Sequence, residues 1–229
     1  MTRTLLHPCF TGLEEIDWDD TGSILEGCTP VFDALTTDPP LFPALLDTLP
    51  GQERLTGMCE QYDFLSKLVL HTGGRDGQIR VRLHLYRPGY FDRPHNHRWP
   101  FAARIVCGSY RHKLFGQDQN FGEHTNPRQL QPICERIETP GSTYALQHTG
   151  VHTVQAEADT ISLLIRGPAA KDRFLILDAA AERFFWVYGA AQETATQRAS
   201  KQMNAIQLAE TITRVRQLTG LNSSKPEDQ

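Results

Sequence analysis

From residue 65 to residue 189, hydrophobic side chains recur at every second position, and this period constrains the fold more than any other feature of the chain. The clearest instance is Ile79–Tyr86 (IRVRLHLY), where aliphatic residues alternate with arginine, histidine and tyrosine. Such alternation predicts a β-strand whose two faces differ chemically. Further short strands are expected at Leu65–His71, Ala102–Cys107, Tyr110–Phe115, Cys134–Glu138, Thr143–Gln147, His152–Ala156, Thr160–Arg166, Phe174–Leu177 and Phe184–Tyr188.

Glycine or proline turns recur between many of these strands, and helical segments do not alternate with them. This arrangement is typical of an antiparallel sandwich or barrel, and it excludes a doubly wound parallel sheet. The predicted fold class is therefore mainly β. One domain is expected, with an antiparallel barrel over residues 65–189 and helical flanks on both sides.

The two flanks lack the two-residue period. Residues 1–64 are expected to form loops and short helices packed on the barrel, because prolines such as Pro30 interrupt the apolar patches. The clearest early helix is expected at Gly51–Phe64. Residues 190–229 predict a helix that ends near Gly220 and is followed by a tail. Its apolar stripe could dock on the barrel or form a dimer contact, and it consists of Ile206, Ala209, Ile212, Val215 and Leu218.

Composition excludes several classes of protein. The 23 lysines and arginines against 27 acidic residues give a net charge of −4, so the chain has no broad basic field for a nucleic acid. No apolar run approaches the roughly 20 residues of a membrane span. The N-terminus turns polar too early for a signal peptide, and the five cysteines are scattered without a CxxC pair. A cytoplasmic protein with reduced thiols is expected, either a monomer or a homodimer, with a small molecule as its partner.

The pair His95-Asn-His97 is the most informative motif. On a strand, residues two apart project from the same face, so the two imidazoles could share one divalent ion with a third ligand from elsewhere. With nine histidines in the chain, a surface or core role would be the commoner explanation of an isolated pair. Here glycines frame the pair, because five residues separate Gly89 from His95 and ten separate His97 from Gly108.

This spacing resembles the first motif of the cupins, in which Gly, five residues, HxH, three or four residues, Glu, six residues and Gly follow in order. Phe101 occupies the glutamate position, so that ligand is missing. The segment from Pro140 to Val154 resembles the second cupin motif and supplies His152 as third ligand, with His148 as a substitute. The resemblance implies a jelly-roll-like antiparallel barrel that holds a metal ion.

Among cupins, a three-histidine site resembles the cysteine dioxygenase family of thiol dioxygenases. Gly77–His97 is similar to that family's strand, turn and HxH segment, and Gly150-Val-His152-Thr-Val resembles its Gly-Leu-His-Arg-Val. Ser162-Leu-Leu-Ile-Arg-Gly-Pro168 is similar to its Ser-Leu-His-Leu-Tyr-Ser-Pro. The resemblance implies Fe(2+) on His95, His97 and His152, with O2 and a small thiol or amino-acid-like anion as substrates.

The chain departs from this family at functional positions. The family's Ser-His-Tyr relay falls on Ser162, Leu164 and Arg166, so only the serine is retained. Ser66-Lys67-Leu-Val stands where the family has Arg-Asn-Leu-Val with its carboxylate-binding arginine. These differences leave open a different small-molecule oxygenase on the same scaffold.

If the strand alignment holds, the polar face of Ile79–Tyr86 points into the barrel. Arg82 and His84 then bind substrate together with Arg166, because a buried arginine without a partner requires an anion. Tyr86 and Ser162 are the expected catalytic side chains. The alternative from periodicity alone is that this face is solvated and that the aliphatic face forms the core.

Two other functions remain possible at this stage. One is a cupin isomerase or lyase that uses zinc, nickel or manganese as a Lewis acid. The other is a small-ligand-binding cupin without catalysis. Asp92, Arg93 and Arg98 flank the HxH pair and could orient its imidazoles. His112 and His124 lie in polar stretches and are expected to face solvent.

Overall fold

The computed structural model describes residues 7–221 except 39, 91, 123, 190 and 191. The strands are β1 (Glu60–Gln61), β2 (Leu65–Gly73), β3 (Ile79–Tyr86), β4 (Phe101–Cys107), β5 (Tyr110–Gln117), β6 (Cys134–Glu138), β7 (Thr143–Leu146), β8 (Gly150–Ala156), β9 (Ile161–Arg166), β10 (Arg173–Asp178) and β11 (Arg183–Tyr188). The α-helices are α1 (Thr21–Thr37), α2 (Leu41–Thr48), α3 (Glu53–Thr56), α4 (Ala195–Lys201) and α5 (Ala205–Thr219). Short 3₁₀ helices lie at Pro8–Glu15, Leu49–Gly51, Arg75–Gly77, Asp118–Asn120 and Pro127–Gln129.

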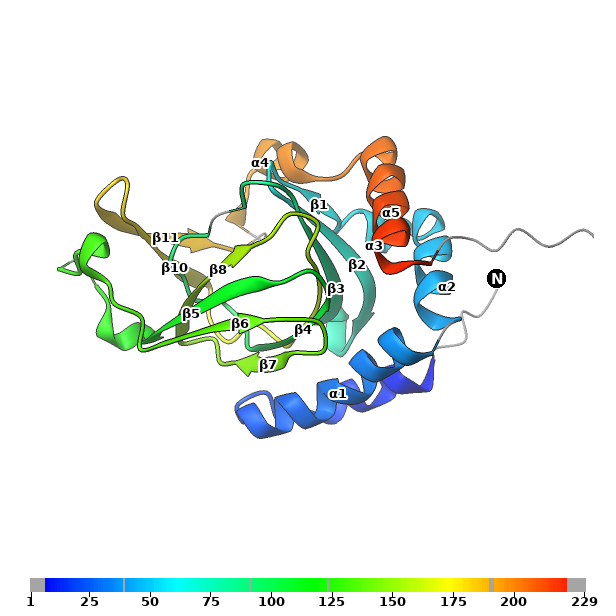
Figure 1. Cartoon of the computed structure of the whole chain (residues 1–229), viewed down its shortest axis with the longest axis horizontal. Coiled ribbons are helices and arrows are strands. Elements are labelled where there is room, and N and C mark those ends of the chain that lie inside the picture. Colours follow the sequence, from blue (N-terminus) through cyan, green and yellow to red (C-terminus); the bar gives the residue numbers. More distant parts are fainter. Residues whose placement is uncertain (1–6, 39, 91, 123, 190–191, 222–229) are drawn as a thin grey trace, which may run out of the picture.

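The strands form antiparallel sheets, and the mainly β fold with helices on both flanks is confirmed. One sheet has six strands in the order β1-β2-β3-β9-β4-β7. A second sheet has the order β6-β5-β8, and β10 and β11 form a hairpin. Figure 1 shows the helices of both flanks gathered on the outer side of the strands. Within the described residues, no helix is long and apolar enough to cross a membrane.

The loop before β4 joins the three-stranded sheet to the hairpin. His95 and His152 exchange backbone hydrogen bonds of 3.0 and 2.8 Å, which ties the loop to β8. On the other side, the Leu177 amide donates to the carbonyl of Pro94 and the Asn96 amide donates to that of Leu175. This short extended segment therefore lies between β8 and β10 and holds the HxH pair against both.

The outer face of the six-stranded sheet packs against the flanking helices. Helix α1 lies against this face and buries Ile24, Val31 and Phe32 completely. Pro30 lies inside α1, so the expectation of only short helices broken at proline was wrong here. One missing N–H costs less than the apolar face of a 17-residue helix contributes when it is buried.

Strand β3 is buried on both of its faces. Val81 and Leu83 are fully buried on the helix side, while Arg82, His84 and Tyr86 are at most 9% exposed on the other side. The alternative in which the polar face of β3 is exposed to solvent was therefore wrong. The prediction that this face points into the barrel is confirmed. Periodicity could not decide this, because an alternating strand that lines an interior cavity has the same pattern as one that faces water.

The flanking helices differ in detail from the expected ones. Glu53–Thr56 is the only α-helical part of the segment expected as a helix at Gly51–Phe64, and β1 follows it. In α5 the buried residues are Leu208, Thr211, Ile212 and Val215, whereas Ile206 is 71% exposed. The predicted apolar stripe therefore matches the buried face of α5 only in part. Helix α5 does end at Gly220, whose φ of 70° caps it.

Candidate metal centre

Three histidines from two segments converge at one end of the space between the sheets. His95 and His97 lie on the loop before β4, and His152 lies on β8. One imidazole nitrogen of each lies within 4.8 Å of the others. In the part of the chain that the structure describes, these are the only three His, Cys, Asp or Glu side chains grouped closely enough to hold one ion. His148 is not among them.

The HxH pair lies on an extended loop and not on a regular strand, which corrects the expected placement. The backbone pairing of His95 with β8 and β10 reproduces the strand geometry locally. The rings of His95 and His97 lie 4.7 Å apart and therefore share one side of the loop. Local strand geometry is sufficient to bring both imidazoles to the same ion.

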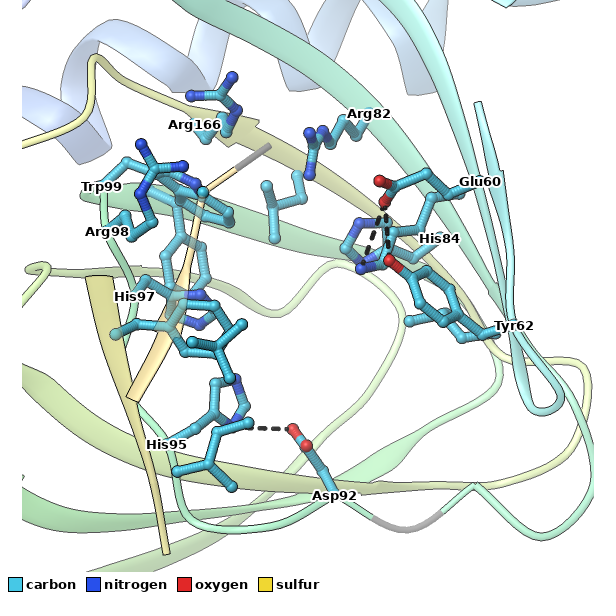
Figure 2. A pocket seen from close by; sticks show the side chains of 18 of the residues that line it. Glu60, Tyr62, Arg82, His84, Asp92, His95, His97, Arg98, Trp99 and Arg166 are labelled. Atoms are coloured by element: carbon cyan, nitrogen blue, oxygen red, sulfur yellow. Dashed lines mark hydrogen bonds and ion pairs between the residues drawn. The ribbon is translucent and has the colours of Figure 1, made fainter. Parts of the chain in front are cut away.

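Hydrogen bonds fix which nitrogen of His95 faces the centre. Its Nδ1 lies 2.8 Å from the carbonyl oxygen of Arg93 and 3.2 Å from Asp92 (Figure 2). Both partners are acceptors, so Nδ1 carries the hydrogen and donates it. The Nε2 lone pair of His95 is therefore left free for a ligand. Of the flanking residues considered from the sequence, Asp92 and Arg93 contact the imidazole.

His152 is held by a buried chain of two further side chains. Its Nδ1 lies 3.0 Å from Nε2 of His112, and Nδ1 of His112 lies 3.1 Å from a carboxylate oxygen of Glu138. Hydrogen bonds from His112 and the charge of Arg136 hold the pKa of Glu138 below its usual value despite its burial, so the carboxylate accepts. Donation then runs from His152 through His112 to Glu138, which leaves Nε2 of His152 as a lone pair.

The expectation that His112 faces solvent was wrong, because its side chain is completely buried. A signal for this placement exists in the sequence. In β5, Tyr110 and His112 are two residues apart and both lie on the inward face, at 2% and 0% exposure. Glu138 could not be found in this way, since its place opposite Tyr110 depends on the register between β5 and β6.

The two innermost imidazoles are neutral. Burial lowers the pKa of His97 and of His152 well below the usual value, and the charges of neighbouring histidines lower both further. Their Nε2 atoms lie only 2.9 Å apart. A divalent ion accepts lone pairs from several neutral imidazoles at once, so this donor set fits a metal of the Fe, Ni, Mn or Zn type.

Two aromatic rings pack against His97 beside the three histidines, and one of them belongs to Phe101, which occupies the glutamate position of the motif. Phe101 packs edge-on against the His97 ring at 4.8 Å, and the Trp99 ring stacks on His97 at 4.7 Å. Phe101 is 1% exposed. These rings fix the orientation of the His97 imidazole.

A cavity of about 870 Å³ opens beside the histidines. It is lined by all three histidines, by the polar face of β3 and by Arg166. Figure 2 shows His95 at one end and Arg82 and Arg166 at the other, with His97 and Trp99 between them. Its volume lies in the range of small-molecule sites.

The structure brings most of the sequence-predicted residues to this cavity. Arg82, His84, Tyr86 and Arg166 line it, and the Ser162 hydroxyl hydrogen-bonds Tyr86. Burial raises the pKa of Tyr86 although this hydrogen bond opposes the rise, so the phenol keeps its proton. Leu164 also lines the cavity as an apolar wall, and the relay histidine of the resembled family has no counterpart there.

No protein-family model matches the chain, and no curated protein matches it. Among solved structures, KdgF from Halomonas sp. is 14% identical with a TM-score of 0.35, over 47% of this chain and 85% of that chain. An RmlC-like cupin from Shewanella frigidimarina is 16% identical with a TM-score of 0.37, over 50% of this chain and 86% of that chain. The DMSP lyase DddQ from Ruegeria pomeroyi is 13% identical with a TM-score of 0.37, over 50% of this chain and 52% of that chain.

Proposed function

We propose that this protein is a non-haem iron(II)-dependent oxygenase that oxidises a small anionic substrate with O2. The observation that carries the proposal is the donor set. Three imidazoles, with a phenylalanine in place of a carboxylate ligand, stand at the wall of a cavity whose other end is cationic.

Iron(II) held by three neutral imidazoles keeps its double positive charge and open coordination positions, so it supplies a site for an anionic substrate beside O2. A set with a carboxylate ligand would neutralise part of that charge. The chain therefore favours substrates that bring their own negative charge to the metal.

The residues of the cavity would bind and orient that substrate. Arg82, Arg166 and the neutral His84 can hydrogen-bond its acceptor groups at the end away from the histidines. Burial lowers the pKa of His84 well below its usual value, so the imidazole acts without adding charge. Tyr86, kept protonated and positioned by Ser162, would donate a hydrogen bond to substrate oxygen or sulfur.

The resemblance to thiol dioxygenases makes small thiol carboxylates the first substrates to test. The absent relay histidine and the serine, Ser66, at the family's arginine position argue for including amino acids and carboxylates without a thiol. Lys67, which follows this serine, lines the cavity but pairs with Glu60 at 3.8 Å, so it is not a free cation for a substrate carboxylate.

The test is oxygen uptake by protein loaded anaerobically with iron(II), measured across that panel. Uptake that depends on one substrate, that is lost in His97→Ala and that persists in His148→Ala would support the proposal. Iron binding without uptake on any member, together with turnover of a substrate by the zinc or manganese form, would instead establish Lewis-acid chemistry.

A further inference from the structure

A cluster of three arginines lines the cavity on two neighbouring strands. Arg80 on β3 lies directly opposite Arg166 on β9, and Arg82 lies two residues further along β3. In an antiparallel pair, opposite residues and residues two apart share one face, so all three guanidinium groups point to the same side. Like charges placed directly opposite each other destabilise a sheet.

Arg82 and Arg166 are buried and Arg80 is partly buried. Among their side-chain donors in the described part of the chain, one hydrogen bond is made, from Nη1 of Arg166 to the carbonyl oxygen of Gly167 at 3.2 Å. Arg82 is 9% exposed and Arg166 is 8% exposed. The Nε atoms of Arg80, Arg82 and Arg166 are all buried without a hydrogen-bond partner. Because a guanidinium keeps its charge at every ordinary pH, the fold holds three positive charges with unsatisfied donors at the cavity wall.

The acidic residues of the cavity are already engaged. Glu60 accepts from Lys201 at 3.0 Å and from the Tyr62 hydroxyl at 3.2 Å, and it lies 3.8 Å from Lys67. Asp92 faces His95 at the other end (Figure 2). In the part of the chain that the structure describes, no carboxylate forms an ion pair with any of the three arginines.

Electrostatics within the cluster favour a bound anion. Burial lowers the pKa of Arg166, and the charges of Arg82 and Arg80 lower it further. Burial also lowers the pKa of Arg82, although the negative charge of Glu60 opposes part of this shift. Both effects oppose the charged form, and an anion between the guanidinium groups would reverse them.

Trp99 connects the cluster to the metal centre. The guanidinium carbons of Arg166 and Arg82 lie 5.5 and 5.8 Å from the centre of its ring, and the same side chain stacks on His97. One aromatic side chain therefore spans from the arginines to the metal ligands. A substrate held at the arginines could present its other end to the histidines along this ring.

We propose that Arg80, Arg82 and Arg166 form a receptor for a dianionic group of the substrate, either a phosphate or a pair of carboxylates. One carboxylate carries a single negative charge and two oxygens, so it can neither neutralise three guanidinium groups nor accept a hydrogen bond from each free Nε. A dianion carries twice the charge and offers enough oxygens for paired hydrogen bonds. The inference rests on the proposed function in taking this cavity as the substrate site. It narrows the substrate class from any small anion to one that carries two charges at the end remote from the metal.

Calorimetric titration of the metal-free full chain tests the receptor independently of the oxygenase proposal. Inorganic phosphate, malonate and acetate are titrated separately at matched ionic strength after removal of metal with a chelator. Phosphate and malonate are expected to bind at one site per chain at least tenfold more tightly than acetate. Tighter binding of phosphate would identify a phosphate group, and tighter binding of malonate a dicarboxylate.

Variants locate the binding. Arg82→Met and Arg166→Gln are each expected to weaken binding of the preferred dianion at least tenfold. Each is also expected to raise the melting temperature of the anion-free protein, because it removes a buried positive charge that its neighbours repel. Arg75→Met changes an exposed arginine outside the cavity and should alter neither quantity. A variant that loses dianion binding but melts at a higher temperature is still folded, so its loss of binding does not come from unfolding.

Equal affinity for acetate and for both dianions in the wild-type protein would overturn the proposal, and so would dianion binding that both cavity variants retain. Iron(II) binding is then measured on the same variants. Loss of dianion binding with retained iron binding supports the receptor, whatever the oxygen-uptake assay shows. Absence of iron binding with intact dianion binding would refute the oxygenase and leave the receptor standing.

Discussion

The Nε2 atoms of His97 and His152 lie 2.9 Å apart, and one comes from a loop and the other from a strand of the second sheet. Because the contacts of His152 direct its Nε2 lone pair toward His97, the pair needs a proton or a cation between the rings. A metal ion held also by His95 satisfies all three side chains at once. The predictions below follow from this arrangement and from the fold that supports it.

The buried chain behind His152 should determine metal affinity. Replacing His112 by Ala removes the acceptor for His152 Nδ1, so the imidazole loses its fixed tautomer and orientation. Metal affinity is expected to fall about 10- to 100-fold, as measured by cobalt(II) titration followed by absorbance. His124→Ala, at an exposed histidine, is the matched control and should bind as the wild type does. Unchanged affinity in His112→Ala would show that the chain does not position His152.

Asn96 should be essential to the loop that carries the HxH pair. It is completely buried, accepts from the Leu175 amide at 2.7 Å and donates to Asp118 at 2.6 Å. Asn96→Ala leaves the buried Leu175 amide without a partner and removes one of the two contacts of the Asp118 carboxylate, which keeps only Lys171 at 2.6 Å. Chemical denaturation should show a loss of about 2–4 kcal/mol in the free energy of unfolding. A loss below about 0.5 kcal/mol would contradict the assigned network.

Gly108 is required by a close approach of the backbone. Its φ is +74°, and an added Cβ would lie 2.7 Å from the Cα of Thr160. Gly108→Ala is expected to lower the free energy of unfolding by about 2–4 kcal/mol, from backbone strain and overpacking together. Gly141→Ala is the control, because its φ is +88° and its Cβ would meet nothing within 4 Å. It should lose only about 1 kcal/mol from strain. Equal losses in both variants would contradict the close approach.

Acid should destabilise the fold through His71, which stacks on Phe10 with ring centres 4.1 Å apart. Burial lowers its pKa from 6.5 to about 4, although Glu14 opposes the shift. As pH falls below 6.5 the unfolded chain takes up the proton first, so stability present above pH 6.5 is lost progressively down to about pH 4.

Between pH 7 and pH 5 the wild-type protein should therefore lose about 2 kcal/mol more unfolding free energy than His71→Gln, which has no proton to gain. The other buried histidines titrate equally in both proteins, so they cancel in the comparison. Denaturation curves at the two pH values measure the difference. Parallel losses in both proteins would show that His71 is not buried in this way.

Much of the fold could be predicted from the sequence because strand periodicity is a local signal. The expected strand at Cys134–Glu138 matches β6, and Thr160–Arg166 differs from β9 by one residue. The three histidines could be found because short spacing and framing glycines bring HxH pairs to one side. Helix α1 could not be found around Pro30, since its stability comes from burial against the distant β4 and β7.

The sequence predicted Arg82 and Arg166 as anion-binding residues, but it could not predict which charged side chains become neighbours through strand pairing. Arg80 and Arg166 are 86 positions apart in number, and only the β3–β9 register makes them opposite neighbours. Glu138 reaches His112 in the same way, across the pairing of β5 with β6. Registers of this kind are set by the whole sheet and not by the local pattern.

The most direct test of the account is the number of metal ions that the chain binds and the residues that this binding requires. Iron(II) titrated anaerobically into chelator-treated protein should bind at one ion per chain. His152→Ala should abolish that binding, and His148→Ala, which changes a nearby histidine outside the group, should retain it. Absence of iron binding in the wild-type protein, or equal binding in His152→Ala, would contradict the three-histidine centre.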